Sequence, residues 1–287
     1  MLQKVRLAIS SAPGALSKRL PPRWATHPLM MRLWRLLLVR FDGSLDDGDR
    51  ALLMKVDITI HPEENMGAGD PGHYLHVGLS AVRSIDAVLG RANVEHVGSV
   101  LDFPSGYGRV LRFLALRFPD ATLTAGDLDE KAVAFCAATF GAAPVLSAEN
   151  FSQVLLPGDF DLIWCGSLMT HVSAQRAIDL LQCLSRRLRS RGVLTFTTHG
   201  EHVADRLRSG AKYRLVDRDV ALVLDQYSRT GFGYADYPGE SCYGVSLISP
   251  AWVRRQIAEI GTLKEVYHGP RAWGDHQDVW GVADGRL

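Results

Sequence analysis

The stretch that decides the fold is residues 99–109, with the sequence Ser-Val-Leu-Asp-Phe-Pro-Ser-Gly-Tyr-Gly-Arg. Its first five residues predict a buried strand, and a helix is predicted from Gly108 to Arg117. Gly106 and Gly108 permit positive φ and let the backbone approach a ligand closely. The start of the following helix offers free N–H groups to a polar ligand. In an open parallel sheet the ligand crevice lies at the carboxyl ends of the strands, which is where this turn falls.

Strands and helices alternate on both sides of the turn. The predicted helices are 73–90, 108–117, 130–140, 174–189, 217–227 and 252–260, and the predicted strands are 99–103, 122–126, 161–165, 193–197, 262–267 and 278–282. Such alternation predicts right-handed crossovers and a parallel sheet covered by helices on both faces. The last two strands are joined by a turn and not by a helix, so they are expected to pair antiparallel at the end of the sheet.

A carboxylate follows the second predicted strand. Asp127 lies 19 residues beyond Gly108, where its side chain would reach two ribose hydroxyls. The glycine turn and this acid together predict a cofactor that contains ribose. The dinucleotide pattern needs a third glycine three residues after Gly108, but Leu111 stands there, which disfavours a dehydrogenase that binds a pyrophosphate.

With these features the chain resembles the class I S-adenosylmethionine-dependent methyltransferases. Residues 102–109 resemble their first motif, with a proline in place of the usual first glycine. Residues 126–129 (Gly-Asp-Leu-Asp) are similar to their ribose motif, and residues 160–167 (Phe-Asp-Leu-Ile-Trp-Cys-Gly-Ser) to their fourth-strand motif. The order and spacing of the three motifs carry the resemblance, which covers about residues 74–282.

A narrower similarity is to bacterial methyltransferases encoded with sugar-polymer and secondary-metabolite pathways. It rests on residues 102–109, on Ser-Leu-Met-Thr-His at 167–171 and on His-Gln-Asp-Val at 276–279. These similarities imply that the acceptor of the methyl group is a small molecule or a glycan.

The family resemblance implies a fold, a cofactor and a binding site. The fold is α/β, a Rossmann-like seven-stranded mostly parallel sheet with an antiparallel last strand, and the cofactor is S-adenosyl-L-methionine. Asp102 and Gly106 would face the methionine part, and Asp127 would bind the ribose. Leu128 would pack on adenine. The full set of implied cofactor-binding residues is Tyr74, Asp102, Pro104, Ser105, Gly106, Gly108, Asp127, Leu128, Ala148, Glu149, Cys165 and Gly166.

Three histidines are candidates for a general base in methyl transfer. Such a base removes the proton of an acceptor hydroxyl and typically contributes about 10²–10⁴-fold in rate. His171 follows the fourth-strand motif and is expected to face the cleft near the methyl group, so it is the first candidate. His199 and His276 are the others. The alternative for His171 is a structural role, in which it caps the next helix or bonds the backbone.

No metal site is expected. The pairs His73/His76 and His199/His202 have helical spacing, but no cluster of cysteines or acids completes a familiar zinc set. The four cysteines lie far apart, which argues against a disulfide framework and favours a reducing, cytoplasmic location.

Charge separates the start of the chain from the rest. The first 41 residues hold eight basic residues and no acid, so they carry +8, whereas the remainder carries −7. The acidic remainder argues against a nucleic-acid partner. The basic segment either contacts anionic lipid peripherally or packs across the body of the fold with its arginines in water. No stretch is long and apolar enough to cross a bilayer, and the charged start does not resemble a secretory signal.

The predicted organisation is a basic helical N-terminal extension, residues 1–65, followed by a methyltransferase domain, residues 66–287. Within the latter, residues 201–248 are a candidate substrate lid. Five aromatic residues fall between Tyr227 and Tyr243, where they either stack on a sugar or aglycone or form the core of a small subdomain. The predicted function is O-methylation of a small molecule or glycan. The alternatives are an NAD(P)-dependent oxidoreductase and a non-catalytic partner protein that retains the cofactor fold.

Overall fold

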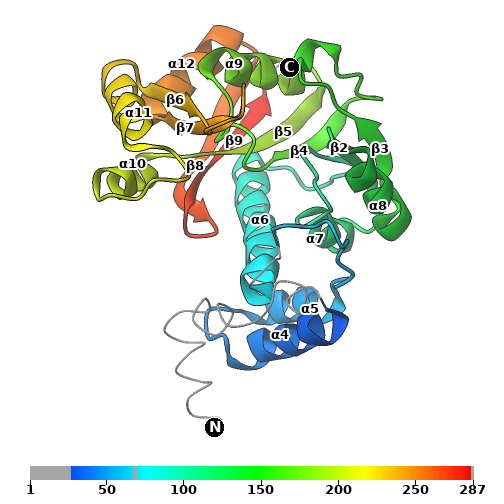
Figure 1. Cartoon of the computed structure of the whole chain (residues 1–287). Helices are drawn as coiled ribbons and strands as arrows, with labels where there is room; N and C mark the ends of the chain where they lie inside the picture. Colours follow the sequence, from blue (N-terminus) through cyan, green and yellow to red (C-terminus); the bar gives the residue numbers. More distant parts are fainter. Residues whose placement is uncertain (1–26, 67–69, 286–287) are drawn as a thin grey trace.

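The computed structural model describes residues 27–66 and 70–285 and has a seven-stranded sheet at its centre (Figure 1). The strand order is β3-β2-β1-β4-β5-β9-β8. Strands β1 to β5 pair in parallel, and β9 pairs antiparallel with both β5 and β8. The predicted Rossmann-like sheet with an antiparallel last strand is therefore confirmed. Its strands are β1 Ser99–Asp102, β2 Thr122–Asp127, β3 Ala143–Leu146, β4 Phe160–Cys165, β5 Leu188–Thr198, β8 Leu263–Trp273 and β9 Gln277–Asp284.

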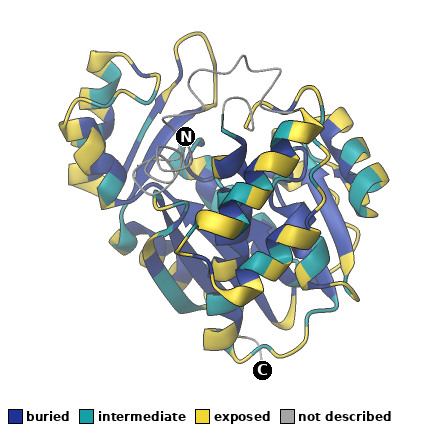
Figure 2. Ribbon diagram, turned by 90° about the horizontal axis from the view of Figure 1, so that it is seen from below, coloured by how far each residue is buried: buried dark blue, intermediate teal, exposed yellow. Residues whose placement is uncertain are grey.

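Helices cover both faces of this sheet, as the alternation predicts. On one face α9 and α12 form an apolar core with the strands, and on the other face α6, α7 and α8 form a second core. Figure 2 shows exposed residues on the outer sides of the helices and buried strands behind them. These helices are α6 Pro71–Ala92, α7 Leu111–Arg117, α8 Glu130–Phe140, α9 Ala174–Ser185 and α12 Pro250–Ile260, and a short 3-10 helix, η1, spans Phe151–Gln153.

The long helix α6 is built as its apolar spacing predicts. Tyr74, Val77 and Ile85 are all buried on its inner face. The helix does not end at Gly90, because it continues to Ala92 and Asn93 adopts the left-handed conformation that closes it.

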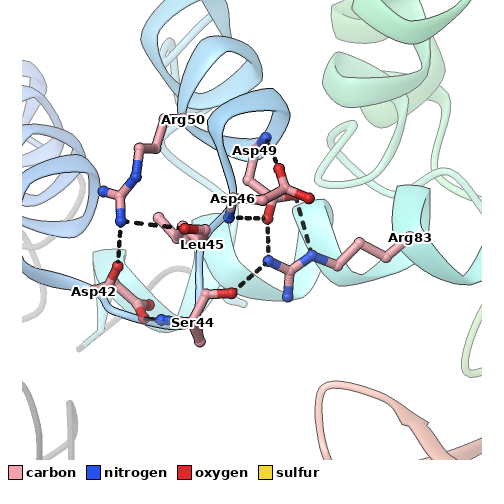
Figure 3. A network of polar contacts seen from close by, with 7 residues as sticks. All are labelled: Asp42, Ser44, Leu45, Asp46, Asp49, Arg50 and Arg83. Carbon is pink, nitrogen blue, oxygen red and sulfur yellow. Dashed lines mark hydrogen bonds and ion pairs between the residues drawn. The ribbon is translucent and has the colours of Figure 1, made fainter.

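Two N-terminal helices, α4 (Pro28–Phe41) and α5 (Asp47–Lys55), pack against α6 and α7. The guanidinium of Arg83 on α6 donates to the carboxylate of Asp49 on α5 and to the carbonyl of Ser44 (Figure 3). Arg50 of α5 donates to the carbonyls of Asp42 and Leu45. These contacts tie the described part of the predicted extension to the sheet-covering helices. The first 26 residues of the basic segment lie outside the described residues.

Helix α4 presents two of its three basic residues outward, whereas Arg35 is partly buried and donates to the carbonyl of Val56 at 3.3 Å. Met31, Trp34 and Leu38 are buried against the neighbouring helices, whereas Arg32 and Arg40 are exposed. In the described ranges no helix is long and apolar enough to cross a membrane.

Residues 201–248 form a separate cap at the end of the sheet. The cap has its own apolar core, made by α10 (Glu201–Arg208), α11 (Asp217–Thr230) and the antiparallel pair β6 (Phe232–Asp236) and β7 (Gly244–Ile248). The N–H groups of β7 donate to the carbonyls of Thr170, His171 and His199, which follow β4 and β5. The cap is thus joined through its backbone to the segments that leave the carboxyl ends of two central strands.

The predicted helix 174–189 is too long. It ends at Ser185, because the carbonyl of Arg187 accepts the N–H of Phe160 and Leu188 then pairs with Phe160 as the start of β5. The pairing resumes at Val193, so residues 189–192 form an irregularity in the strand. Strand β5 therefore begins five residues before its predicted start.

Candidate active site

A pocket of about 180 Å³ opens at the carboxyl ends of β1, β2 and β4. It brings together seven of the residues that the sequence singled out: Asp102, Pro104, Ser105, Gly106, Asp127, Gly166 and His171. Six of the twelve implied cofactor-binding residues and the first base candidate therefore line one cavity.

The glycine turn forms the floor of the pocket. Gly106 has φ +49°, and a Cβ built on it would meet no atom within 4 Å, so the space in front of its backbone is open. Gly108 has φ +75°, and a Cβ there would lie 2.4 Å from the ring of Phe140. Gly106 thus leaves room for a ligand, whereas Gly108 is required for close packing on α8.

Asp127 is held in place by the loops around it. One carboxylate oxygen, Oδ2, accepts the N–H of Gly106 at 2.8 Å, and the other, Oδ1, accepts the N–H of Asp129 at 3.0 Å. Each oxygen keeps a further lone pair, and the side chain is only partly buried. The carboxylate is therefore fixed in orientation and still able to accept hydroxyl hydrogens.

Asp102 has a different environment. Its side chain is 1% exposed, and Oδ2 has no hydrogen-bond partner among residues 27–66 and 70–285. Burial, together with the nearby charge of Asp127, raises the pKa of Asp102 well above its usual value. A buried carboxylate oxygen without a partner is costly, and a cationic ligand group would stabilise it. The pocket therefore fits a ligand that carries an ammonium group.

The first-choice base, His171, is oriented by the cap. Its Nδ1 lies 2.8 Å from the carbonyl oxygen of Gly244. A carbonyl only accepts, so this contact assigns the proton to Nδ1 and leaves Nε2 as a proton acceptor. The ring also stacks on Tyr243, with 4.8 Å between centroids. Burial lowers the pKa of His171, which keeps the ring neutral near pH 7.

The other two histidines lie outside this pocket. His199 is buried, and its Nδ1 is 3.2 Å from the carbonyl oxygen of Ser246, two residues beyond the Gly244 carbonyl that orients His171. Its ring centroid is 6.3 Å from that of His171 and 5.4 Å from that of His276. Burial lowers the pKa of His199 well below its usual value. His276 lines a neighbouring cavity.

The remaining residues that the sequence singled out do not line the pocket. Tyr74 is buried in α6 and points its hydroxyl at Glu64. Cys165 is fully buried in the core on the α9 face, and Leu128 is 56% exposed beside Asp127. The set outside the pocket is Tyr74, Gly108, Leu128, Ala148, Glu149, Cys165, His199 and His276.

Sequence reasoning did not find several residues that line the pocket. Glu64 and Met66 come from the segment between α5 and α6, which carries no recognisable motif. Arg109 is part of the first motif, and its guanidinium lies 5.6 Å from the centroid of the Trp273 ring. Tyr243 belongs to the aromatic cap segment, whose concentration of rings is the only signal that could have found it. In the described part of the chain, no group of three or more His, Cys, Asp or Glu side chains could hold a metal ion.

A family model described as a methyltransferase domain matches residues 100–192, the part of the chain that contributes the glycine turn, Asp127 and His171. The match spans about a third of the chain, and this part is similar to a methyltransferase domain. No curated protein sequence matches the chain.

Solved structures resemble this methyltransferase domain. An S-adenosylmethionine-dependent methyltransferase from Clostridium acetobutylicum ATCC 824 is 14% identical, with a TM-score of 0.52 over 72% of this chain and 92% of that chain. This likeness shows a shared fold. A sugar N-methyltransferase from Streptoalloteichus sp ATCC 53650 is 27% identical over 41% of this chain and 46% of that chain, with a TM-score of 0.35. Magnesium protoporphyrin IX methyltransferase from Synechocystis PCC 6803 is 13% identical over 88% and 99% of the two chains, with a TM-score of 0.47.

Proposed function

We propose that this protein transfers a methyl group from S-adenosylmethionine to a hydroxyl of a small molecule or glycan, with His171 as the general base. One observation carries the proposal: His171 lines the same pocket as Asp102, Gly106 and Asp127. The base candidate and the residues proposed to hold the methyl donor are thus within reach of one bound pair of substrates.

The pocket residues fit the parts of the donor. Asp102 would accept a hydrogen bond from the amino group of the methionine part, which gives its unpartnered Oδ2 a cationic donor. Asp127 would accept both ribose hydroxyl hydrogens. The backbone of Pro104, Ser105, Gly106 and Gly166 would border the methionine part, and Leu128, Ala148 and Glu149 lie on the side proposed for adenine.

When bound, S-adenosylmethionine would supply a methyl group on a sulfonium: the lone pair of an acceptor oxygen attacks the methyl carbon in line, and the carbon–sulfur bond breaks to release S-adenosylhomocysteine. The chain mainly holds the two substrates in that alignment, which can supply roughly 7–11 kcal/mol of the barrier in favourable cases. Nε2 of His171 takes the hydroxyl proton as the new oxygen–carbon bond forms. The carbonyl of Gly244 stabilises the resulting imidazolium through Nδ1–H.

The oxidoreductase alternative is less well supported. Leu111, which stands where a dinucleotide-binding helix needs a glycine, is fully buried in the core between the sheet and α6 to α8. The family match also favours methyl transfer. The third possibility, a non-catalytic partner protein, predicts that no acceptor is methylated.

The test compares wild type with His171→Ala and His171→Gln, using mass spectrometry to detect methylated product from a panel of hydroxyl-bearing sugars and phenols. Glutamine is able to donate to the Gly244 carbonyl but is no base. Both variants are expected to lose about 10²-fold or more in turnover and to keep the affinity for S-adenosylhomocysteine, measured by calorimetry. Full activity in His171→Gln would mean that the side chain has a structural role. If both variants keep activity within a few-fold of wild type, His171 is not the base. The remaining candidates are then His199, His276 or catalysis by proximity alone.

A further inference from the structure

A second cavity, of about 450 Å³, lies directly beside the donor pocket. The two cavities share Met66, Arg109, Ser167 and Trp273 as lining residues. The second cavity extends from this common wall to α10 of the cap, where Arg206 lines it, and to the turn between β8 and β9, where His276 does. A molecule bound there would border the donor pocket.

The common wall is rigid at Ser167. This residue has φ +64°, a conformation that costs a non-glycine residue free energy and persists only where neighbours impose it. The hydroxyl of Thr197 accepts the Ser167 N–H at 2.8 Å, and the side-chain amide of Gln277 donates to Ser167 Oγ at 3.0 Å. Thr197 also donates to Gln277 Oε1 at 2.6 Å, so three side chains lock one another. The boundary between the two cavities is therefore fixed at Ser167.

The charges in the second cavity are unbalanced. Arg109 and Arg206 both line it, and neither guanidinium has an ion pair within the described ranges. Arg109 lies over the ring of Trp273 and Arg206 over that of Tyr213, contacts that position a guanidinium without neutralising it. The one acid in the lining, Asp275, is paired with Arg271 at 2.8 Å. Arg109 also faces the carboxylates of Glu64 and Asp102 in the donor pocket, so Arg206 is the cation of this lining without an acidic partner among the described residues.

The histidine in the same wall is affected by this positive charge. His276 is partly buried, and the pKa of its ring is lowered by burial first, and by the nearby His202, Arg206 and Arg271. With a neutral ring at this position, the permanent charges in the lining are those of Arg109, Arg206 and Asp275, and Asp275 is paired with Arg271.

We propose that the second cavity binds the acceptor through an oxyanion, a carboxylate or a phosphate, held by the guanidinium of Arg206 with Arg109 at the junction. Guanidinium groups match the geometry of both anions and form charge-assisted hydrogen bonds with them. The acceptor hydroxyl then reaches across the boundary at Ser167 toward His171. The proposal rests on the proposed function, because it places the acceptor relative to the donor pocket.

The experiment measures binding to the protein saturated with S-adenosylhomocysteine, so that only the second cavity remains for the probe. Benzoate and phenyl phosphate are titrated separately by calorimetry, and benzamide serves as the neutral match for benzoate. Whichever anion binds more tightly identifies the carboxylate or the phosphate as the group recognised.

The variants are Arg206→Gln, Arg206→Lys and the matched control Arg208→Gln. Arg208 lies two residues further along α10 and is paired with Glu201 and Asp205 outside the cavity. We expect saturable binding of at least one anion to wild type, tenfold or more loss in Arg206→Gln, partial recovery in Arg206→Lys and no change in Arg208→Gln.

Absence of saturable binding of both anions, equal binding of benzamide and benzoate, or wild-type affinity in Arg206→Gln would each overturn the proposal. Binding of S-adenosylhomocysteine is measured first in every variant. If wild type does not bind S-adenosylhomocysteine, the proposed donor site is refuted. The anion titrations are then carried out on the unliganded protein, so that the second cavity is tested independently.

Discussion

The two sides of the active site are built in different ways. The donor side comes from one short stretch: Asp102, Gly106 and Asp127 lie within 26 residues and are positioned by two adjacent parallel strands. The acceptor side is assembled from the segment after β4, from the cap and from the β8–β9 turn, which are far apart in the sequence. The proposed donor site is therefore specified by local sequence, whereas the proposed acceptor site depends on how the cap docks on the sheet.

The largest expected effect is on the donor side. Asp127→Ala removes a fixed carboxylate that would accept two hydroxyl hydrogens, and hydrogen bonds to charged groups contribute about 1.5–3 kcal/mol each. We expect calorimetry to show roughly 10²-fold weaker binding of S-adenosylhomocysteine. Asp120→Ala, which removes an exposed carboxylate ahead of the same strand, should bind like wild type. Tight binding of NADH in place of S-adenosylhomocysteine would contradict the donor assignment.

Asp102 predicts a pH dependence for donor binding. Its pKa is raised, so the carboxylate becomes protonated at a higher pH than an ordinary aspartate, and the protonated form attracts an ammonium group less. Affinity for S-adenosylhomocysteine should fall as the pH drops through this raised pKa, by at most about tenfold per pH unit. In Asp102→Asn the affinity for S-adenosylhomocysteine should be lower than in wild type at pH 8 and should change less with pH. Parallel pH profiles for both proteins would show that Asp102 does not contact the amine.

His199, which is buried beside the cap and lines neither cavity, is expected to affect stability. The pKa of His199 is lowered by burial, so the unfolded chain binds its proton more readily than the folded protein does. Protonation of this histidine therefore leaves the stability unchanged above about pH 6.5, and below that value it destabilises the fold by up to about 1.4 kcal/mol per pH unit. The free energy of unfolding, measured with urea from pH 8 to pH 5.5, should fall less steeply with decreasing pH for His199→Gln than for wild type. An unchanged slope would mean that another group controls the acid sensitivity.

The smallest effect is expected far from both sides, at the N-terminal helices. Asp49 is 5% exposed and accepts from Arg83, so Arg83→Gln leaves a buried carboxylate short of a partner. A loss of about 1–2 kcal/mol in the free energy of unfolding is expected from urea titration. The control is Arg117→Gln, whose partner Asp86 is well exposed, with an expected change of about 0.5 kcal/mol or less. Equal losses would show that burial of Asp49 does not matter.

How well the sequence predicted each element depends on where its stabilising contacts come from. Helix α8 has exactly the predicted bounds, because the Asp129 side chain caps its start and Gly141 closes its end in the left-handed conformation. Strand β3 was missed, since only Val145 of its four residues is buried and no apolar pattern marks it. The start of β5 depends on pairing with Phe160 in another strand, which local propensity does not show.

The residues of the candidate site likewise differ in whether local sequence or distant segments place them in the pocket. The glycine turn and the acid after the second strand predicted Gly106 and Asp127 as ligand-binding residues, and the family resemblance implied Asp102; all three line the pocket. Glu64 could not be predicted, because it enters the pocket from the segment between α5 and α6, which carries no motif. His199 follows a central strand, as was expected of a base, yet cap residues bury it.

Strand β7 has a consequence for redesign of the enzyme. Its carbonyls at Gly244 and Ser246 face the two histidines, and its N–H groups hold the backbone of Thr170, His171 and His199. A side chain at Gly244 would collide with the carbonyl of Ala235, so the position tolerates no substitution without displacing β6. Chimaeras that exchange the cap for another specificity should therefore keep residues 244–248 of the host and graft only the part before them. Strand β7 would stay with the host protein, and the part of the cap that precedes it would be exchanged.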